Sequence, residues 1–242
     1  MLSIVPTPIG NLGDITLRAL ETLRACDLVA AEDTRHSGLL LKHFEISKPF
    51  VSFHEHNEAS RTAELVPRLA GGLHVAMVTD AGMPGISDPG TRLIRACRAE
   101  GIPVTVLPGA CAAITALIGS GLAGDAFAFG GFLPNKSGRR EKTLREALES
   151  RHPTVFHESP HRILKALETI KALAPDRTVC VARELTKHHE EYREGTAEEL
   201  LAHFTSRNPK GEICLVLAPA TKGEKPPWSE PLERHAETDR MQ

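Results

Sequence analysis

Hydrophobic positions in the first half of the chain form short runs that are separated by longer amphipathic stretches. The runs predict β-strands at residues 2–7, 28–31, 50–53, 75–79 and 104–107. Apolar residues that recur every three to four positions predict helices at residues 15–25, 58–70, 90–100 and 110–119. This alternation of strands and helices is typical of an α/β fold.

The second half repeats the alternation after a glycine-spaced joint at residues 119–124, where we predict a domain boundary. Strands are predicted at residues 126–132, 154–156, 179–182, 192–194 and 213–217, and helices at 141–149, 161–173 and 197–204. The expected organisation is an N-terminal α/β domain (1–120) and a C-terminal α/β domain (121–220). Residues 221–242 are charged, contain proline and show little periodicity, so we expect a flexible tail.

Local signals mark three helix starts. Asp88 and Ser159 are each followed by proline, which is the sequence of an N-cap and a first helical position. Thr196 with Glu199 three residues later has the sequence of a capping box.

Composition narrows the class of protein. Of 242 residues, 41% are hydrophobic but only 4% are aromatic, so the core must be largely aliphatic. The net charge of -2 gives no sign of a nucleic-acid partner, and RNA contacts would have to come from local patches. Five scattered cysteines without a CxxC pair favour a reducing compartment over disulfides or zinc. No apolar run approaches the ~20 residues of a membrane span, so we expect a cytoplasmic protein without membrane contact.

The segment at residues 78–90, VTDAGMPGISDPG, is the most informative for chemistry. A strand ends there in a loop of glycines, prolines and two aspartates before a helix begins. Glycine lets the backbone approach a ligand closely, and open α/β sheets bind ligands at the carboxyl ends of strands. The alternative is a tight turn capped by Asp88. Residues 107–113 and 6–14 form two further loops after strands. The loop after the first strand, 6–14, is not GxGxxG, which disfavours a dinucleotide site, and GxxxxGK[ST] does not occur in the chain, which disfavours a P-loop.

Several motifs together resemble the ribosomal RNA small subunit methyltransferase I family of the tetrapyrrole methylases. They are TPIGNLGDIT, AEDTR, SFHEHNE, DAGMPGISDPG, LPGACA, GFLPNK, HESPHRI, ARELTKHHEE and GEICLVL, and they extend over about residues 3–217. The resemblance implies two α/β domains of the tetrapyrrole methylase fold with S-adenosylmethionine in the cleft between them. It also implies a homodimer that methylates the 2′-hydroxyl of a cytidine in the decoding region of 16S rRNA, within the small ribosomal subunit.

The resemblance also implies which residues contact the cofactor. They are Pro8, Ile9, Asp80, Gly82, Met83, Cys111, Ala112, Leu133 and Leu185, with Gly211 and Glu212 nearby. The family usually has serine and threonine at the positions of Thr79 and Met83. Thr79 keeps a hydroxyl, whereas Met83 keeps only its backbone for such a contact.

A ribose hydroxyl is a weak nucleophile, so a general base worth about 10²–10⁴-fold in rate is expected. Polar residues after the second and third strands supply the candidates Glu32, Asp33, His54, His56 and Glu58. On a strand the two histidines would share a face and could move protons or hold a phosphate. A metal is not predicted, because no third ligand accompanies them. The alternative is that Glu32, Asp33 and Asn57 only cap helices and connect loops.

A basic segment departs from the neutral average and is the predicted RNA contact. Its residues, which Arg35 extends, are Lys136, Arg139, Arg140, Lys142 and Arg145. Phosphate contacts there would give an affinity that falls with added salt. The alternative is an ordinary charged helix face. Aromatic residues are too few for base stacking to be the main grip.

Two other functions compete. Tetrapyrrole C-methyltransferases have a related fold but typically a GxGxGD-like first loop, where this chain has TPIGNLGD, and the basic GFLPNKSGRR segment favours RNA. A non-catalytic ribosome-binding module would not bind S-adenosylmethionine.

Overall fold

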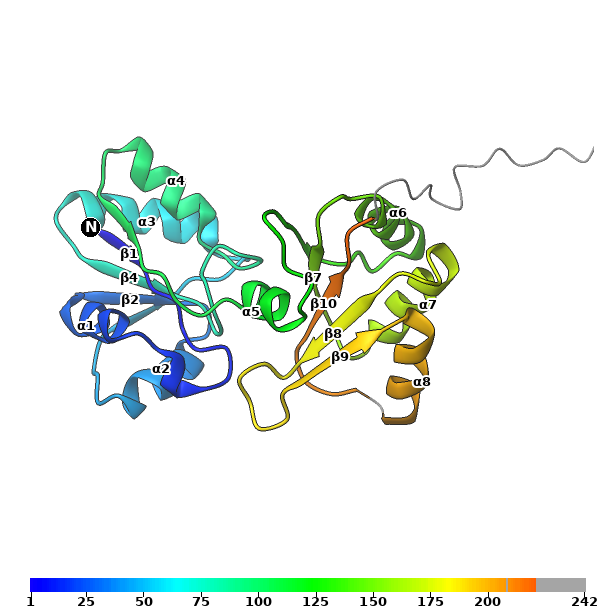
Figure 1. Cartoon of the computed structure of the whole chain (residues 1–242). Coiled ribbons are helices and arrows are strands. Elements are labelled where there is room, and N and C mark those ends of the chain that lie inside the picture. Colours follow the sequence, from blue (N-terminus) through cyan, green and yellow to red (C-terminus); the bar gives the residue numbers. More distant parts are fainter. Residues whose placement is uncertain (208, 221–242) are drawn as a thin grey trace, which may run out of the picture.

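The first half of the chain forms a five-stranded parallel sheet in the computed structural model, which describes residues 1–207 and 209–220 (Figure 1). The strand order is β3-β2-β4-β1-β5. The strands are β1 (Leu2–Ile4), β2 (Leu28–Ala31), β3 (Phe50–Ser52), β4 (Val75–Val78) and β5 (Val104–Val106). Every residue of β2 and β4 is buried. Such continuous apolar runs are what a parallel sheet covered on both faces requires.

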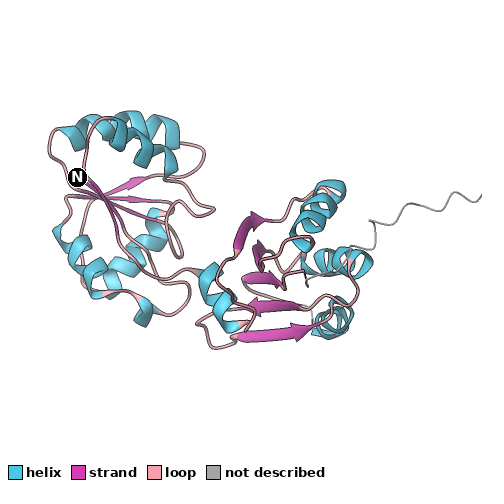
Figure 2. Ribbon diagram, turned by 45° about the horizontal axis from the view of Figure 1, so that its top comes forward, coloured by secondary structure: helices cyan, strands magenta, loops and turns pink. Residues whose placement is uncertain are grey.

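Helices lie on both faces of this sheet, as Figure 2 shows. Its helices are η1 (Leu12–Asp14), α1 (Leu17–Ala25), α2 (Thr34–His43), α3 (Glu58–Ala70) and α4 (Thr91–Ala99). Side chains of α3 and α4 share one core cluster with Leu2 and Met77, while α1 and α2 share the other with Ala76 and Val78. Alternate residues of one strand therefore supply opposite cores.

The helix α2 is absent from the sequence-based prediction, which placed no element at residues 34–43. Its buried face consists of Ser37, Leu40 and Leu41, at helical spacing. Asp33 is the N-cap, and its carboxylate accepts the backbone N–H of Arg35 at 2.8 Å. The pattern is short and contains Gly38 and polar residues, so the helix depends on packing against the sheet rather than on propensity.

The second half forms a mixed sheet with the order β6-β7-β10-β8-β9. The strands are β6 (Ala128–Phe132), β7 (Thr154–Glu158), β8 (Val179–Arg183), β9 (Glu191–Gly195) and β10 (Ile213–Leu217). Only the β6–β7 pair is parallel among the described strands of this sheet. One face packs against α6 (Ser137–Leu148), α7 (Ile163–Leu173) and α8 (Ala197–Arg207). The α/β fold predicted from the sequence is confirmed in both halves.

The helix α5 (Ala112–Gly119) covers the other face of the second sheet. Its Ala113, Ala116 and Leu117 pack in one cluster with Val155 and Val216. The helix α5 directly follows β5 of the first sheet in the chain, but it packs on the second sheet, on the face opposite α6, α7 and α8. The domain boundary at residue 120 stays a prediction.

The capping box of α8 is confirmed, whereas the two predicted Xaa-Pro helix starts are wrong. Thr196 donates its N–H to Glu199 at 2.8 Å and accepts the N–H of Glu199 at 3.3 Å. By contrast, α4 begins after Gly90 and α7 after Arg162. Asp88-Pro89 and Ser159-Pro160 lie in the preceding turns, where proline also fits because its φ is fixed. Likewise α6 begins at residue 137, before the predicted residue 141.

Within the described residues, no helix is long and apolar enough to span a membrane. The expected flexible tail, residues 221–242, lies outside the described part of the chain.

Candidate active site

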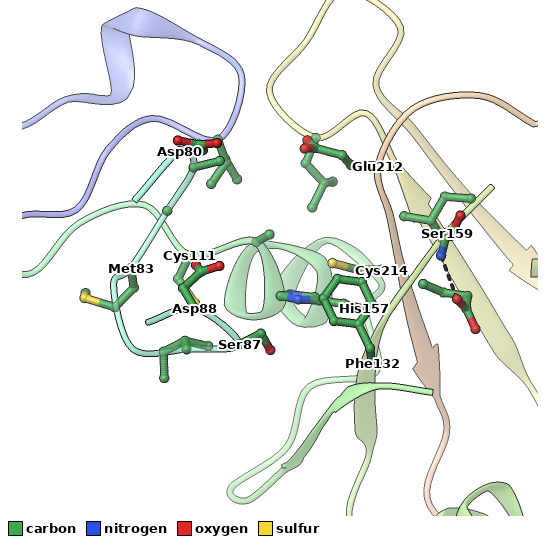
Figure 3. Close-up of a pocket in the computed structure, with 18 of the residues that line it drawn as sticks. Asp80, Met83, Ser87, Asp88, Cys111, Phe132, His157, Ser159, Glu212 and Cys214 are labelled. Carbon is green, nitrogen blue, oxygen red and sulfur yellow. Dashed lines mark hydrogen bonds between the residues drawn. The ribbon is translucent and has the colours of Figure 1, made fainter. Parts of the chain in front are cut away.

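A cavity of about 440 Å³ lies between the two sheets (Figure 3). One wall comes from loops that follow β1, β2, β4 and β5, at the carboxyl edge of the parallel sheet, where α/β folds bind ligands. The opposite wall comes from the end of β6, the turn after β7, Leu185 and the start of β10. The volume falls within the roughly 300–1,000 Å³ of small-molecule sites.

The turn after β4 is held against the loop after β1 by a two-way backbone contact. Gly82 donates its N–H to the Thr7 carbonyl at 3.1 Å, and Thr7 donates to the Gly82 carbonyl at 3.0 Å. Gly82 has φ of +83°, and a Cβ there would lie 3.3 Å from Ile9 Cγ2. Glycine is therefore needed both for the backbone conformation and for the close approach of the two loops.

Three carboxylates line this first wall: Glu32, Asp80 and Asp88. Asp80 Oδ1 accepts the backbone N–H of Asp33 at 3.1 Å, which connects the AEDTR and DAGMPGISDPG motifs. Burial, together with repulsion from Glu32 and Asp80, raises the pKa of Asp88 to about 7. Burial and Asp80 also raise the pKa of Glu32. No cluster of metal-ligating side chains occurs in the part of the chain that the structure describes.

On the opposite wall, Glu158 is held by Arg162. The Arg162 Nη2 lies 2.6 Å from a Glu158 side chain that is only 1% exposed, and Ser159 donates its N–H to the same carboxylate at 2.7 Å. Burial raises the pKa of Glu158, although Arg162 opposes the shift. Arg162 also donates to the carbonyl of Leu133 at 3.3 Å, so this network fixes the wall rather than offering a free carboxylate.

The aromatic part of this wall depends on two glycines in β6. The register with β7 shifts between Phe129 and Phe132, around Gly130 and Gly131. Gly131 has φ of +66°, and a Cβ at Gly130 would overlap the Phe156 ring. Such bulges redirect side chains beside active sites. Phe132 consequently lines the cavity while remaining 56% exposed.

His157 lies beside that ring. Its imidazole stands edge-on to Phe129 and Phe132, with ring centroids 5.0 and 5.3 Å away. Burial lowers the pKa of His157, which favours the neutral ring. Its Nε2 is buried and has no hydrogen-bond partner among the described residues.

Most of the expected cofactor residues meet at the cavity. The residues that line it are Ile9, Asp80, Gly82, Met83, Cys111, Ala112 and Leu185, with Gly211 and Glu212. Pro8 and Leu133 are not part of the lining, and Leu133 is buried in the core of the second sheet. Sequence reasoning did not place Ser87, Asp88, Phe132, His157 and Cys214 at the site, although all five stand in the quoted motifs.

The candidate bases separate in space, and only Glu32 lines the cavity. Asp33 caps α2, and hydrogen bonds from Arg35 hold its pKa well below the usual range. Glu58 Oε1 accepts the backbone N–H groups of Gly90 and Arg92 at 2.9 and 3.3 Å, so it caps α4.

The prediction that a strand aligns His54 and His56 is wrong, because β3 ends at Ser52 and both histidines follow in a turn. Asn57 organises that turn: its Oδ1 accepts the His54 N–H at 2.9 Å, and its Nδ2 donates to the Ser52 carbonyl at 3.2 Å. Neither histidine lines the cavity.

The basic residues also differ in their surroundings. Lys136 and Arg139 are exposed at the start of α6, whereas Arg140 is only 9% exposed and donates to the Asn135 carbonyl at 3.3 Å. The other three predicted contacts form surface ion pairs, namely Arg35 with Asp33, Lys142 with Glu146 and Arg145 with Glu141.

Comparison with known proteins agrees with this arrangement. Residues 1–201 match the family model of the tetrapyrrole (corrin/porphyrin) methylases. A Synechocystis sp. protein named ribosomal RNA small subunit methyltransferase I is 50% identical over 231 residues, covering 95% of this chain and 83% of the relative. Proteins of the same name from Escherichia coli O157:H7 and Thermotoga maritima are 50% and 48% identical, covering 89% and 90% of this chain and 77% and 97% of the relatives.

Solved structures share the fold at lower identity. Uroporphyrin-III C-methyltransferase from Thermus thermophilus has a TM-score of 0.64 at 23% identity, covering 90% of this chain and 93% of that one. Diphthine synthase has a TM-score of 0.67 at 17% identity, covering 90% and 89%. The chain therefore belongs to the ribosomal RNA small subunit methyltransferase I family, S-adenosylmethionine-dependent methyltransferases with the tetrapyrrole methylase fold.

Proposed function

We propose that this protein methylates the 2′-hydroxyl of a cytidine in the decoding region of 16S rRNA, with S-adenosylmethionine as donor. The observation that carries the proposal is a single cavity with an acidic, small-residue wall facing an aromatic wall, in a chain about half identical to enzymes named for small-subunit RNA methylation. The first wall suits a cationic donor, and the second suits a nucleoside.

The residues of the first wall fit S-adenosylmethionine. When bound, this cofactor supplies a reactive methyl group on a positively charged sulfur. Glu32, Asp80 and Asp88 place negative charge around the cavity, which favours a cation. The small side chains of Ala81 and Ala112, and the absence of one at Gly82, let a ligand lie against the backbone, while the apolar side chains of Ile9, Met83 and Leu185 suit a flat heterocycle.

The second wall and α6 supply features that suit RNA. Phe132 presents a half-exposed ring within the cavity, and a nucleobase stacks on such a ring. Lys136, four residues further along the chain, and Arg139 begin a basic helix outside the cavity. Contacts from these two residues to phosphates would hold the strand while the ring holds the target base.

We also propose that the chain acts as a homodimer in the cytoplasm, where ribosomal subunits are its substrate. Ile114 and Ile118 are 42% and 65% exposed and lie one turn apart on α5, so they share a face, and Val106 is 50% exposed on the edge strand β5. A second copy would cover these apolar side chains. Sedimentation equilibrium should show a dimer that Ile118→Glu converts to a monomer, whereas a monomeric wild type would contradict the assembly.

Methyl transfer from labelled S-adenosylmethionine to unmethylated small ribosomal subunits tests the activity. A methylated 2′-oxygen cannot attack the adjacent phosphodiester, so the target should appear as a single alkali-resistant linkage at a cytidine of the decoding region. Label on a base or elsewhere in 16S rRNA would contradict the assignment. Labelling of uroporphyrinogen or a precorrin instead of RNA would favour the tetrapyrrole reaction, and no binding of S-adenosylhomocysteine by calorimetry would favour a non-catalytic module.

A further inference from the structure

Asp88 differs from Asp80, Glu32 and Glu158, which also line the cavity, because no described residue holds its side chain. Asp80 accepts the backbone N–H of Asp33, and Glu158 is paired with Arg162. The backbone N–H of Asp80 favours the ionised form of Glu32 and opposes the rise in its pKa. For the Asp88 side chain, no hydrogen bond or ion pair connects it to any residue that the structure describes, although it lines the cavity.

The backbone around Asp88 is nevertheless well fixed. Ser87 before it adopts a left-handed conformation with φ of +63°, and Pro89 follows. Two residues on, Glu58 of α3 accepts the N–H of Gly90 at 2.9 Å. The carboxylate is thus presented from a constrained turn, and Figure 3 shows it on the wall opposite Phe132 and His157. A constrained but unpaired acceptor beside a ligand cavity is available to a substrate.

A second feature indicates where the substrate would lie. The bulge at Gly130 and Gly131 turns Phe132 into the cavity, opposite Asp88. A nucleobase stacked on this ring would direct its ribose toward the interior of the cavity and the acidic wall. This second feature is independent of the carboxylates, because it follows from the β6–β7 register.

We propose that Asp88 is the general base of the reaction and accepts the proton of the ribose hydroxyl; this assignment rests on the proposed function. The hydroxyl oxygen forms a bond to the donor methyl carbon as the carbon–sulfur bond breaks and its electron pair remains on sulfur. The O–H bond breaks, and its proton passes to a carboxylate oxygen of Asp88. A cationic sulfonium and an anionic carboxylate thereby become a neutral thioether and a neutral acid. Loss of opposite charges is favoured in a partly desolvated cavity relative to water.

The charged groups around Asp88 make it a suitable base near neutral pH. Those at the cavity or packed near the turn are Glu32 and Asp80 on the same wall, Glu58 of α3, Arg92 of α4, and, across the cavity, His157, Glu158, Glu212, Cys111 and Cys214. Burial comes first in raising the pKa of Asp88 to about 7, and Glu32 and Asp80 add to it. A base whose pKa lies near the working pH combines deprotonation with strong proton affinity.

Single-turnover methyl transfer to unmethylated small ribosomal subunits, measured from pH 5.5 to 9, tests the assignment. The wild-type rate should rise about tenfold per pH unit below about pH 7 and level off above it. Asp88→Asn should lower the rate at pH 8 by about 10²–10⁴-fold and remove the levelling. Asp88→Glu should restore part of the rate and the levelling. Binding of S-adenosylhomocysteine by calorimetry should be unchanged in both variants, which also shows that they are folded.

Two further variants sharpen the result. Glu32→Gln, on the same wall, should keep a levelling of the rate but move it to lower pH, because the Glu32 charge helps to raise the pKa of Asp88. Asp176→Asn, an exposed aspartate outside the cavity lining, should behave as wild type. An Asp88→Asn enzyme that keeps the levelling near pH 7, or that loses cofactor binding in proportion to its rate, would overturn the assignment. Loss of the levelling in Glu32→Gln, with the levelling kept in Asp88→Asn, would also overturn the assignment. If the wild-type enzyme methylates no subunits, the proposed function fails, and this assignment fails with it.

Discussion

At the scale of single residues, the aromatic wall of the cavity depends on side chains that the backbone turns into position. Gly130 leaves room for the Phe156 ring, and Gly131 adopts a left-handed conformation. These two glycines place the next residue, Phe132, in the cavity lining, where its ring contacts the His157 ring. Phe132 is therefore the ring to which the proposed function assigns the target base.

Phe132→Ala should raise KM for unmethylated small subunits by about 5–150-fold, because stacking of one base on an aromatic side chain is worth about 1–3 kcal/mol. The turnover number should change much less, since Phe132 does not take part in proton transfer. Steady-state kinetics at several subunit concentrations would measure both. Phe127→Ala is the matched control, because Phe127 is also exposed but lies outside the cavity lining. Equal effects of the two variants would exclude a stacking role.

At the scale of elements, one carboxylate connects the third helix to the start of the fourth. Glu58 opens α3, yet its oxygen caps α4, whose first turn has no side-chain cap of its own. The same contact steadies the turn that carries Asp88. Glu58 of the HEHNE motif thus holds the start of α4 and does not line the cavity.

Glu58→Ala should lower the free energy of unfolding by about 0.5–2 kcal/mol, the usual value of a lost N-cap. Binding of S-adenosylhomocysteine should weaken as well, because the turn between residues 80 and 90 loses an anchor. Urea denaturation and calorimetry would measure the two effects. Glu55→Ala, in the same motif but exposed, should leave both unchanged. Normal stability of Glu58→Ala would show that the cap contributes nothing.

The start of α6 carries two exposed basic residues, Lys136 and Arg139, and one buried arginine, Arg140. Lys136→Ala and Arg139→Ala should each reduce the slope of log affinity against log salt by about 0.7, the value for one phosphate contact on single-stranded RNA. Arg140→Ala should instead lower the melting temperature, because its buried guanidinium holds the Asn135 carbonyl. Filter binding of small subunits across salt concentrations, with exposed Lys165→Ala on α7 as control, separates the two cases. An unchanged slope for Lys136→Ala and Arg139→Ala would remove α6 from the RNA interface.

At the scale of the whole molecule, the buried carboxylates of the cavity make the free energy of unfolding depend on pH. Burial raises the pKa of Asp88 from 3.8 to about 7, so the folded state binds the proton more tightly than the unfolded state. A raised pKa contributes stability that is fully present below the unfolded value and is lost as the pH rises through the folded value. The burial of Glu32 shifts its pKa in the same direction.

Asp88→Asn should therefore melt at a higher temperature than wild type at pH 8, and the difference should shrink as the pH falls from about 7 to about 4. Differential scanning calorimetry at pH 4, 6 and 8 would follow it. A lower melting temperature of the variant at pH 8 would mean that the ionised carboxylate has a stabilising partner. Together with a loss of rate, a gain in stability would show that the cavity retains this charge for function.

Local pattern and contiguous motifs were sufficient for the alternation of strands and helices, the capping box of α8 and the family, and they named many of the residues that line the cavity. These features depend on residues close together in the chain, where apolar period and small residues carry the signal. The roles of Glu58 and Phe132 could not be read in this way. The Glu58 carboxylate acts on the N–H of Gly90, 32 residues away, and Phe132 depends on a register shift against β7.

The sequence by itself thus determined the two α/β halves and the loops that would meet a ligand. Only the tertiary structure decided that α2 forms, that α5 packs on the second sheet, and that Asp88 faces Phe132 across one cavity. The physical reason is that short-range periodicity records which face of an element is buried, whereas the choice of partner follows from packing between distant segments. Packing leaves the Asp88 side chain in the cavity without a partner among the described residues, whereas Asp33, Asn57 and Glu58 make hydrogen bonds that hold turns and helix starts.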